Sequence, residues 1–281
     1  MGGVGKDLST LRPAGASVKN AAKSSTGAAS FMDVDSAITT EVAQRGRRGA
    51  LMLTLDIRHP DVEEFITKKQ DLSKVTGANI SVKVTDDFME AVWKDDDYYL
   101  TFPVDAPKLR LDPNSKDLDD YNVLHQDLDG IYYKRIRAKK LWELLIHCAW
   151  NTAEPGIMFE DRHIEFSPDG VYPQYRGVST NPCGEIFMQP YDSCRLIHIN
   201  LTSFVKRAYY PDASIDYDLL RKVAKAAIRL GDDLVDLEVE AIGQILGHIT
   251  SSKGDNHREF KLWMAVRDAA LASRRCGVGF T

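Results

Sequence analysis

One cysteine of this sequence lies between an amide and a carboxylate at alternate positions. The segment reads Ser-Thr-Asn-Pro-Cys-Gly-Glu over residues 179–185. Alternate side chains of an extended loop face the same side, so we expect Asn181, Cys183 and Glu185 to converge on one ligand. Cysteine suits nucleophilic or radical chemistry, glutamate moves protons, and asparagine orients hydroxyl groups. The alternative, with even weight, is a buried structural cysteine in a turn.

The other three cysteines carry weaker signals. Cys194 precedes the apolar run 196–205, which favours a core position at the start of a strand. Cys148 shares a helical stripe with leucines and is expected in the core. Cys276 has no assigned role. Four cysteines are too few for a disulfide scaffold, so each thiol is judged singly.

Two further patterns suggest anion binding. The cluster Arg-Gly-Arg-Arg-Gly at 45–49 could grip a phosphate, although a solvated basic turn is the favoured alternative. The opening Gly-Gly-Val-Gly-Lys-Asp departs from the nucleotide-hydrolysing phosphate loop, because Asp7 follows Lys6 and no strand precedes it. The scattered histidines form no metal-binding motif, so no metal site is predicted.

The elements that must position these residues follow from periodicity. Alternating apolar residues predict strands at 50–57 and 80–84, each followed by a helix, and such units are typical of α/β architecture with parallel strands. Residues 1–30 are expected to form loops with one short helix, residues 94–135 a surface excursion with a hairpin near 98–102, and residues 154–180 an ordered loop. Further helices are predicted at 31–45, 138–151, 216–240 and 258–275, and strands at 195–205 and from 277.

Composition narrows the class of protein. The 281 residues carry a formal net charge of -5, with 43% hydrophobic and 27% charged residues, which excludes wholesale disorder. The acidic balance argues against a nucleic-acid partner, and no apolar run is long enough to span a membrane. With no export signal, the cytoplasm is the expected location. Both ends look abrupt, so we expect a piece of a larger folded unit, with no linker inside 1–281.

Several segments together resemble the catalytic large subunit of ribonucleotide reductase, in that family's order. They are STNPCGEI followed by DSCRLIHINL, GVGKDLSTLRPAGA, STGAASFM, QRGRRGALM with DIRHPDVEEFI, and TAEPGIMF. The resemblance implies a ten-stranded α/β barrel made of two antiparallel halves of five parallel strands. This chain would supply about the first half, as a single partial domain over 1–281 with flanking helices.

The resemblance assigns roles around an active-site cysteine loop at 179–194. Cys183 matches the thiyl-radical residue that takes the 3′ hydrogen of a ribonucleotide, and Glu185 matches the carboxylate that accepts the 3′-hydroxyl proton. Asn181 matches the amide that holds the ribose hydroxyls. Cys194 matches one of two thiols that supply the electrons and become a disulfide. Thr180 and Gly3 are assigned to substrate binding.

The resemblance also implies regulation by a dNTP or ATP effector, through loops within residues 1–50. Arg12 falls where the family binds effector phosphates at a dimer interface, and Lys19 is assigned to the same site. Residues 42–51 fall on the loop between effector and substrate, with Gln44 and Arg48 at its base-reading positions. The arginine cluster then becomes a specificity switch, in a protein expected to be a homodimer.

Departures from the family limit what the chain is expected to do alone. The usual partner of Cys194, the second half-barrel and the C-terminal cysteine pair are missing, so we expect no turnover without the complementary C-terminal half. A thioredoxin- or glutaredoxin-type protein would be the reductant. The cysteine motifs favour adenosylcobalamin as radical source over a metal-containing partner subunit. A binding module that keeps only the dNTP site, or a cysteine hydrolase with a histidine near Cys183, are the competing functions.

Overall fold

The computed structural model describes residues 3–19, 21–42, 49–113, 120–252, 254 and 256–281. Contacts within the chain divide it into two compact units, Met1–Phe187 and Met188–Thr281, and each unit is described by itself.

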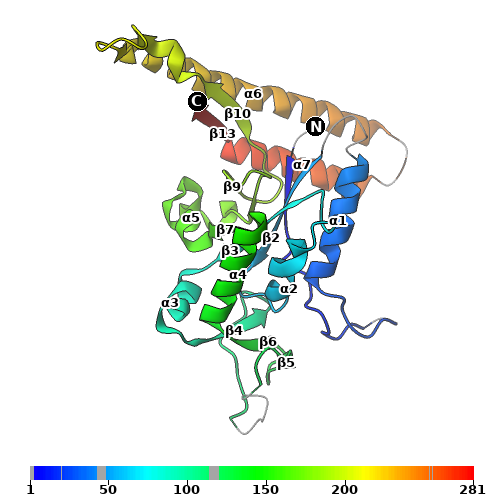
Figure 1. The fold of residues 1–281 in the computed structure, drawn as a ribbon. Helices are drawn as coiled ribbons and strands as arrows, with labels where there is room; N and C mark the ends of the chain where they lie inside the picture. Colours follow the sequence, from blue (N-terminus) through cyan, green and yellow to red (C-terminus); the bar gives the residue numbers. More distant parts are fainter. Residues whose placement is uncertain (1–2, 20, 43–48, 114–119, 253, 255) are drawn as a thin grey trace. The chain divides into compact units, whose positions relative to one another are not determined.

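The first unit is built on a parallel sheet of four strands in the order β1-β2-β3-β7 (Figure 1). The strands are β1 (Gly3–Asp7), β2 (Ala50–Asp56), β3 (Asn79–Val84) and β7 (Gly156–Phe159). In their register Lys6 lies opposite Leu53, and Leu53 lies opposite Ile80. The predicted α/β architecture with parallel strands is therefore confirmed.

Helices cover one face of this sheet: α1 (Ala28–Val42), α2 (Val62–Thr67) and α4 (Ala138–Thr152) (Figure 1). Alternate strand residues pack with them into one buried core that includes Leu53, Ile80, Phe65 and Leu145. Burial of such side chains contributes about 1.5–3 kcal/mol each, so this face holds the sheet together. Cys148 lies in the same core at 2% exposure, as predicted.

The other face of the sheet is polar. The same alternation turns Thr54 and Asp56 of β2, and Ser81 and Lys83 of β3, away from the helices, and all four are buried. The register places Asp7 opposite Thr54, and Asp56 opposite Lys83, so the polar side chains form neighbouring rows. Both the network and the cysteine turn described below lie on this face.

Two predictions for this sheet are wrong. The opening segment is strand β1 rather than a loop, and residues 156–159, within the predicted loop 154–180, form strand β7. Glycine is uncommon in strands, and β1 contains two glycines, while β7 has only four residues and so shows little periodicity. Neither segment therefore carries a strong local strand signal. After β7 the chain forms α5 (Glu160–Phe166) and two short 3-10 helices (Pro168–Val171 and Pro173–Tyr175).

The excursion after α3 (Asp86–Lys94) forms a small antiparallel sheet in the order β4-β6-β5. Strand β4 (Asp97–Phe102) pairs with β6 (Tyr132–Arg137), and β5 (His125–Gln126) pairs with β6. The predicted hairpin near 98–102 is therefore wrong, because the partner of β4 is distant in sequence. At the end of the first unit β8 (Ser179–Thr180) pairs with β9 (Phe187–Met188).

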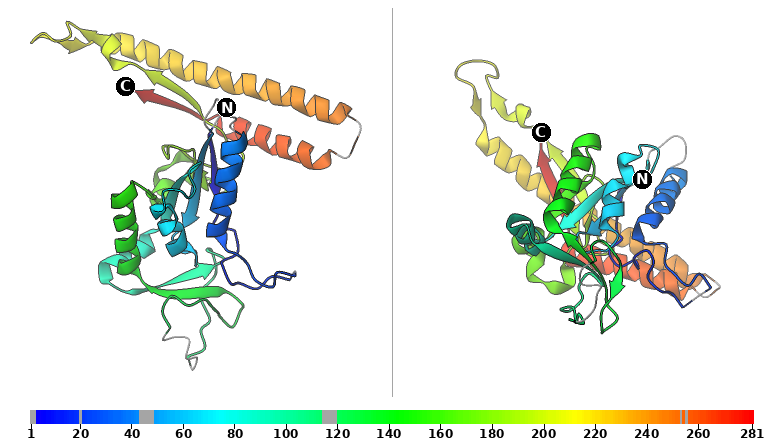
Figure 2. Two further views of the ribbon diagram at one scale, coloured as in Figure 1. Left: turned by 45° about the vertical axis from the view of Figure 1, so that its right-hand side comes forward. Right: turned by 60° about the horizontal axis from the view of Figure 1, so that its bottom comes forward.

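The second unit combines two long helices with a parallel strand pair (Figure 2). Strand β10 (Arg195–Ile199) pairs with β13 (Cys276–Phe280), and α6 (Tyr217–Ser251) packs on both strands and on α7 (His257–Ser273). The predicted strand at 195–205 is shorter, because a 3-10 helix (Leu201–Phe204) and the small pair β11 (Val205–Lys206) and β12 (Ser214–Ile215) follow. No helix in the described parts of the chain is long and apolar enough to cross a bilayer.

Candidate functional site

Cys183 lies at the tip of a tight turn. The N–H of Gly184 donates to the carbonyl oxygen of Asn181 at 3.0 Å, which closes a four-residue turn around Pro182 and Cys183. Gly184 has a φ of +84°, a conformation that glycine adopts without steric cost. The predicted extended backbone is thus wrong, and the thiol of Cys183 is exposed rather than packed in the core.

Of the polar residues near Cys183, one is exposed to solvent and two form hydrogen bonds with the backbone of the loop. Glu185 is exposed, whereas the Asn181 carboxamide oxygen accepts the N–H of Ile186 at 3.1 Å. The Thr180 hydroxyl is buried and donates to the Asn181 carbonyl at 2.9 Å. Asn181 therefore keeps its amide N–H groups for a ligand, while Thr180 shapes the loop backbone; its contact with substrate stays a prediction.

The turn lies directly against the start of the sheet. A Cβ at Gly3 would lie 2.4 Å from the ring of Pro182, and a Cβ at Gly5 would lie 1.8 Å from the carbonyl oxygen of Thr180. The Asn79 amide donates to the Pro182 carbonyl at 2.9 Å. The predicted substrate residue Gly3 thus has a second use, because its missing side chain leaves room for the cysteine turn.

The far end of the loop is held by an aromatic contact. The ring of Phe187 stacks on His163 with centroids 5.1 Å apart and planes 20° apart. A Cβ at Gly177 would lie 2.2 Å from the Phe187 ring, so the backbone closes over that ring. Residues 181–186 are therefore clamped between two packed ends.

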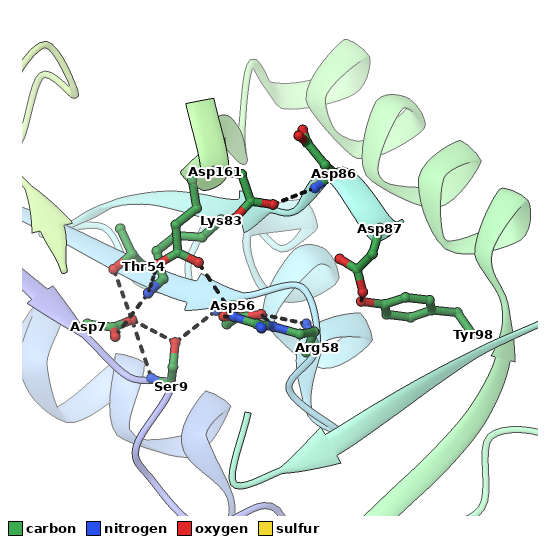
Figure 3. Close-up of polar contacts among 11 residues, drawn as sticks. Asp7, Ser9, Thr54, Asp56, Arg58, Lys83, Asp86, Asp87, Tyr98 and Asp161 are labelled. Carbon is green, nitrogen blue, oxygen red and sulfur yellow. Dashed lines mark hydrogen bonds and ion pairs between the residues drawn. The ribbon is translucent and has the colours of Figure 1, made fainter. Parts of the chain in front are cut away.

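A buried charge network lies on the same polar face (Figure 3). The ammonium of Lys83 donates to Asp7 Oδ2 at 3.2 Å and to Glu160 Oε1 at 3.3 Å. Asp7 Oδ1 accepts from the Ser9 hydroxyl at 2.7 Å and from the Thr54 hydroxyl at 3.2 Å. Thr54 Oγ1 lies 3.0 Å from the hydroxyl oxygen of Ser179, which begins β8. The network therefore reaches the cysteine loop.

The surrounding carboxylates stabilise the charged forms of the two cations in this network, Lys83 and Arg58. Burial lowers the pKa of Lys83, but Asp7, Glu160 and Asp56 outweigh burial and hold that pKa above its ordinary value. Arg58 makes a forked pair with Asp56, at 2.9 Å and 2.5 Å, and lies 3.6 Å from Glu160 (Figure 3). The hydrogen bonds to Asp56 likewise raise the pKa of Arg58. Opposite charges thus compensate each other on this face.

Sequence reasoning missed this network. The available signal was Lys83 in the strand at 79–84, in step with Ser81, together with the polar residues at alternate positions of β2. A lysine is rarely fully buried unless it is paired with an acidic residue. Its position in a strand therefore does not predict burial until those acidic partners are identified. Those partners, Asp7 and Glu160, are 76 and 77 positions away.

Cys194, in the second unit, is half-buried just before β10. Burial raises the pKa of its thiol, and Arg275 partly offsets that effect. Arg275 is itself paired with Asp192 at 2.9 Å. The favoured core position for Cys194 is thus reached only in part, and its redox role stays a prediction.

The residues assigned to the effector lie on a braced loop that leads into α1. Arg12 and Lys19 are exposed, and Arg12 donates to the Ser17 carbonyl at 3.0 Å. The Ser17 N–H donates to the Tyr132 hydroxyl at 2.9 Å. Gln44 and Arg48, with most of the 42–51 loop, lie outside the described residues.

Two side chains from the turn between β2 and α2, His59 and Asp61, hold this loop in place. The Asp61 carboxylate accepts the N–H of Ala14 at 3.0 Å and that of Ala28, the first residue of α1, at 2.7 Å. The buried ring of His59 binds the Leu11 carbonyl through Nε2 at 2.8 Å and accepts the Asp61 N–H at Nδ1 at 3.0 Å. These contacts require a neutral imidazole, and burial accordingly lowers the pKa of His59.

The arrangement offers an exposed thiol beside an exposed carboxylate, on a rigid turn over a polar sheet face. Among the described residues, no histidine is hydrogen-bonded to Cys183, so the hydrolase alternative gains no support. Radical or redox chemistry at the thiol fits this setting, because neither needs a histidine base.

Comparison with known proteins places the chain among reductases. It is 36% identical over 247 residues to the vitamin B12-dependent ribonucleoside-diphosphate reductase of Thermoplasma acidophilum, covering 87% of this chain and 28% of that protein. It is 32% identical over 241 residues to the enzyme of the same description from Mycobacterium tuberculosis, covering 84% and 30%. A match to the Chlamydia muridarum ribonucleoside-diphosphate reductase subunit alpha has 25% identity over 252 residues, covering 84% and 23%.

The chain thus spans under a third of the length of these relatives. The family model for the barrel domain of ribonucleotide reductase matches residues 1–281, from end to end. On the strength of that match, the chain belongs to the ribonucleotide reductase barrel-domain family.

Proposed function

We propose that this chain is part of a catalytic subunit that reduces ribonucleotides to deoxyribonucleotides by thiyl-radical chemistry. One observation carries the proposal: in a chain of the reductase barrel family, Cys183 is exposed at the tip of a clamped turn, with Glu185 exposed two residues away. A structural cysteine is expected to be buried, whereas Cys183 is exposed.

The proposed step uses the chain's own residues as follows. A radical on the Cys183 sulfur takes the 3′ hydrogen of the ribose, while Glu185 accepts the 3′-hydroxyl proton and Asn181 donates to the ribose hydroxyls. The 2′-hydroxyl leaves as water. Cys194 and a second thiol supply two electrons and two protons and become a disulfide, and Cys183 returns its hydrogen to the 3′ carbon. A thioredoxin- or glutaredoxin-type protein then reduces the disulfide.

The vitamin B12-dependent relatives support adenosylcobalamin as radical source, because that cofactor supplies a carbon-centred radical when bound. The residues described here fit such a source in one respect, an exposed thiol that can receive the radical.

We infer that the four parallel strands belong to the first half of a ten-stranded barrel. The sheet has helices on one face and a buried polar network with a cysteine turn on the other, as a barrel wall requires. The strands do not close a barrel, so a complementary half would have to complete the site.

The proposal includes a homodimer regulated by a dNTP or ATP. Helix α1 buries the face that carries Ala28, Ala29, Met32 and Ser36. Its larger apolar side chains on another face are 42–66% exposed: Phe31, Val34, Ile38 and Val42. Such an unpartnered apolar stripe fits a second copy of the chain. The braced loop with exposed Arg12 leads into this helix, so an anionic effector there would be close to the dimer contact.

Complementation tests the catalytic proposal. Co-expression with the remaining barrel segments of a relative should give ribonucleotide-dependent deoxyribonucleotide formation, and Cys183→Ser should abolish it. Cys148→Ser is the matched control, because Cys148 is a core thiol away from the turn and its variant should keep activity. Full activity of Cys183→Ser would refute the radical mechanism.

Nucleotide binding separates the enzyme from a binding module. Calorimetry should show dNTP binding by the dimer that is lost in Arg12→Ala and unchanged in Cys183→Ser. If binding persists while the complemented protein never reduces nucleotides, the chain is a binding module instead. Absence of dNTP binding by a folded dimer would contradict the effector site.

A further inference from the structure

We propose that Lys83 is a positioning residue for the cysteine turn, acting through Asp7, Thr54 and Ser179. This inference rests on the proposed function, and it assigns a task to a buried lysine on the polar face of the sheet. Lys83 is 4% exposed, so it is held inside the protein rather than presented to a ligand.

The donors and acceptors give this network a direction. The Thr54 hydroxyl has a single hydrogen, and it donates to Asp7, whose carboxylate only accepts. The contact between Thr54 and Ser179 must then run the other way, with the Ser179 hydroxyl donating to Thr54 Oγ1. The Ser179 hydroxyl thus points in a defined direction, which depends on Asp7 being in place.

Lys83 provides that condition for Asp7. Its ammonium lies 3.2 Å from Asp7 Oδ2 and 3.3 Å from Glu160 Oε1, so it links the end of β1 to the start of α5. Without the ammonium, the carboxylates of Asp7 and Glu160 would lose the cation that bridges them, and they would move apart. That movement displaces the acceptor that orients Thr54.

The effect reaches the turn because Ser179 begins the short segment that carries it. Ser179 is buried, and two residues separate it from Pro182, which packs on Gly3. The turn's own hydrogen bonds, from Gly184 and Ile186 to Asn181, fix its shape but not its place on the sheet. The side-chain link from Ser179 to Thr54 supplies that placement, together with the amide of Asn79.

Hydrogen exchange on the isolated chain tests the inference without any need for turnover. In Ser179→Ala and Thr54→Val, the amides of Gly184 and Ile186 should exchange about tenfold faster, while those of Leu53 and Leu55 in β2 keep their rates. Lys83→Met should do the same, and Lys83→Arg should restore slow exchange. Lys94→Met is the control, because Lys94 pairs with Glu90 on the surface.

Two results would overturn the positioning role. One is unchanged exchange at the turn in Ser179→Ala and Thr54→Val, which stays decisive even if Lys83→Met fails to fold. The other is faster exchange in β2 and in the turn alike, the mark of general destabilisation. In the complemented enzyme, Ser179→Ala should lower kcat about 100-fold with KM unchanged, since misplacing a reacting group by 1 Å costs that much.

The two proposals fail separately. If complementation gives no nucleotide reduction but exchange follows the expected pattern, the reductase proposal fails and the positioning of the turn stands. If reduction depends on Cys183 but exchange at the turn ignores Ser179, only the positioning role fails.

Discussion

Replacing Gly5 by alanine should displace the cysteine turn from the sheet. The new Cβ would lie 1.8 Å from the carbonyl oxygen of Thr180 and 2.9 Å from its carbon, and both are backbone atoms. Packed atoms rest at about 3.5 Å or more, so β1 and the loop must separate by more than about 1 Å. Overpacking of this kind costs about 1–3 kcal/mol of folding free energy. The same shift would lower a rate that depends on Cys183 about 100-fold.

The assay compares urea unfolding, hydrogen exchange at Gly184, and kcat of the complemented reductase. Gly243→Ala in α6 is the matched control, since a Cβ there would have no packing neighbour within 4 Å beyond its own helical backbone, and the change should stabilise the helix by up to about 1 kcal/mol. Gly5→Ala with an unchanged unfolding midpoint and unchanged exchange at the turn would refute the close approach of β1 and the loop.

Three further predictions concern the brace and the thiols. Asp61→Asn should destabilise the chain by about 1–3 kcal/mol in urea, because one of the two oxygens that accept the N–H groups of Ala14 and Ala28 is replaced by an NH2 group; an unchanged midpoint would contradict the brace. Burial lowers the pKa of His59, so its contribution to stability should be complete above about pH 6.5 and lost as the pH falls below that, and His59→Gln should flatten this decline. Iodoacetamide should alkylate exposed Cys183 before Cys148, whose pKa burial raises, and equal rates by mass spectrometry would exclude this thiol arrangement.

The elements with a strong local period could be predicted from the sequence. Strands β2 and β3 and helices α4 and α7 lie where alternation or a 3.6-residue period placed them. The apolar residues of β2, β3 and α4 face the core, and Cys148 is buried on the α4 stripe. The cysteine motif and its resemblance to the reductase family were also visible in the residues alone, and the family match confirms the resemblance.

Helix α1 was predicted from its period, but the period did not predict which of its faces is buried. Its spacing at 31, 34, 38 and 42 predicts a helix, and the helix exists, but those side chains are exposed and Ala28, Ala29 and Met32 are buried instead. A period identifies an amphipathic helix without saying which surface will cover its apolar face. That choice depends on what packs against it.

Only the tertiary structure decided how the cysteine turn is held. The glycines of β1 suggest a loop by themselves, yet they form a strand because they pair with β2. The backbone of Thr180 and the ring of Pro182 occupy the space that side chains at Gly5 and Gly3 would fill. From the sequence alone, Lys83 would be placed on the surface, because its partners Asp7 and Glu160 lie in distant parts of the chain and only the fold brings them next to it. Periodicity is a property of neighbours in sequence, whereas close approach and charge compensation are properties of neighbours in space, and so the sequence determined the elements while the fold determined their site.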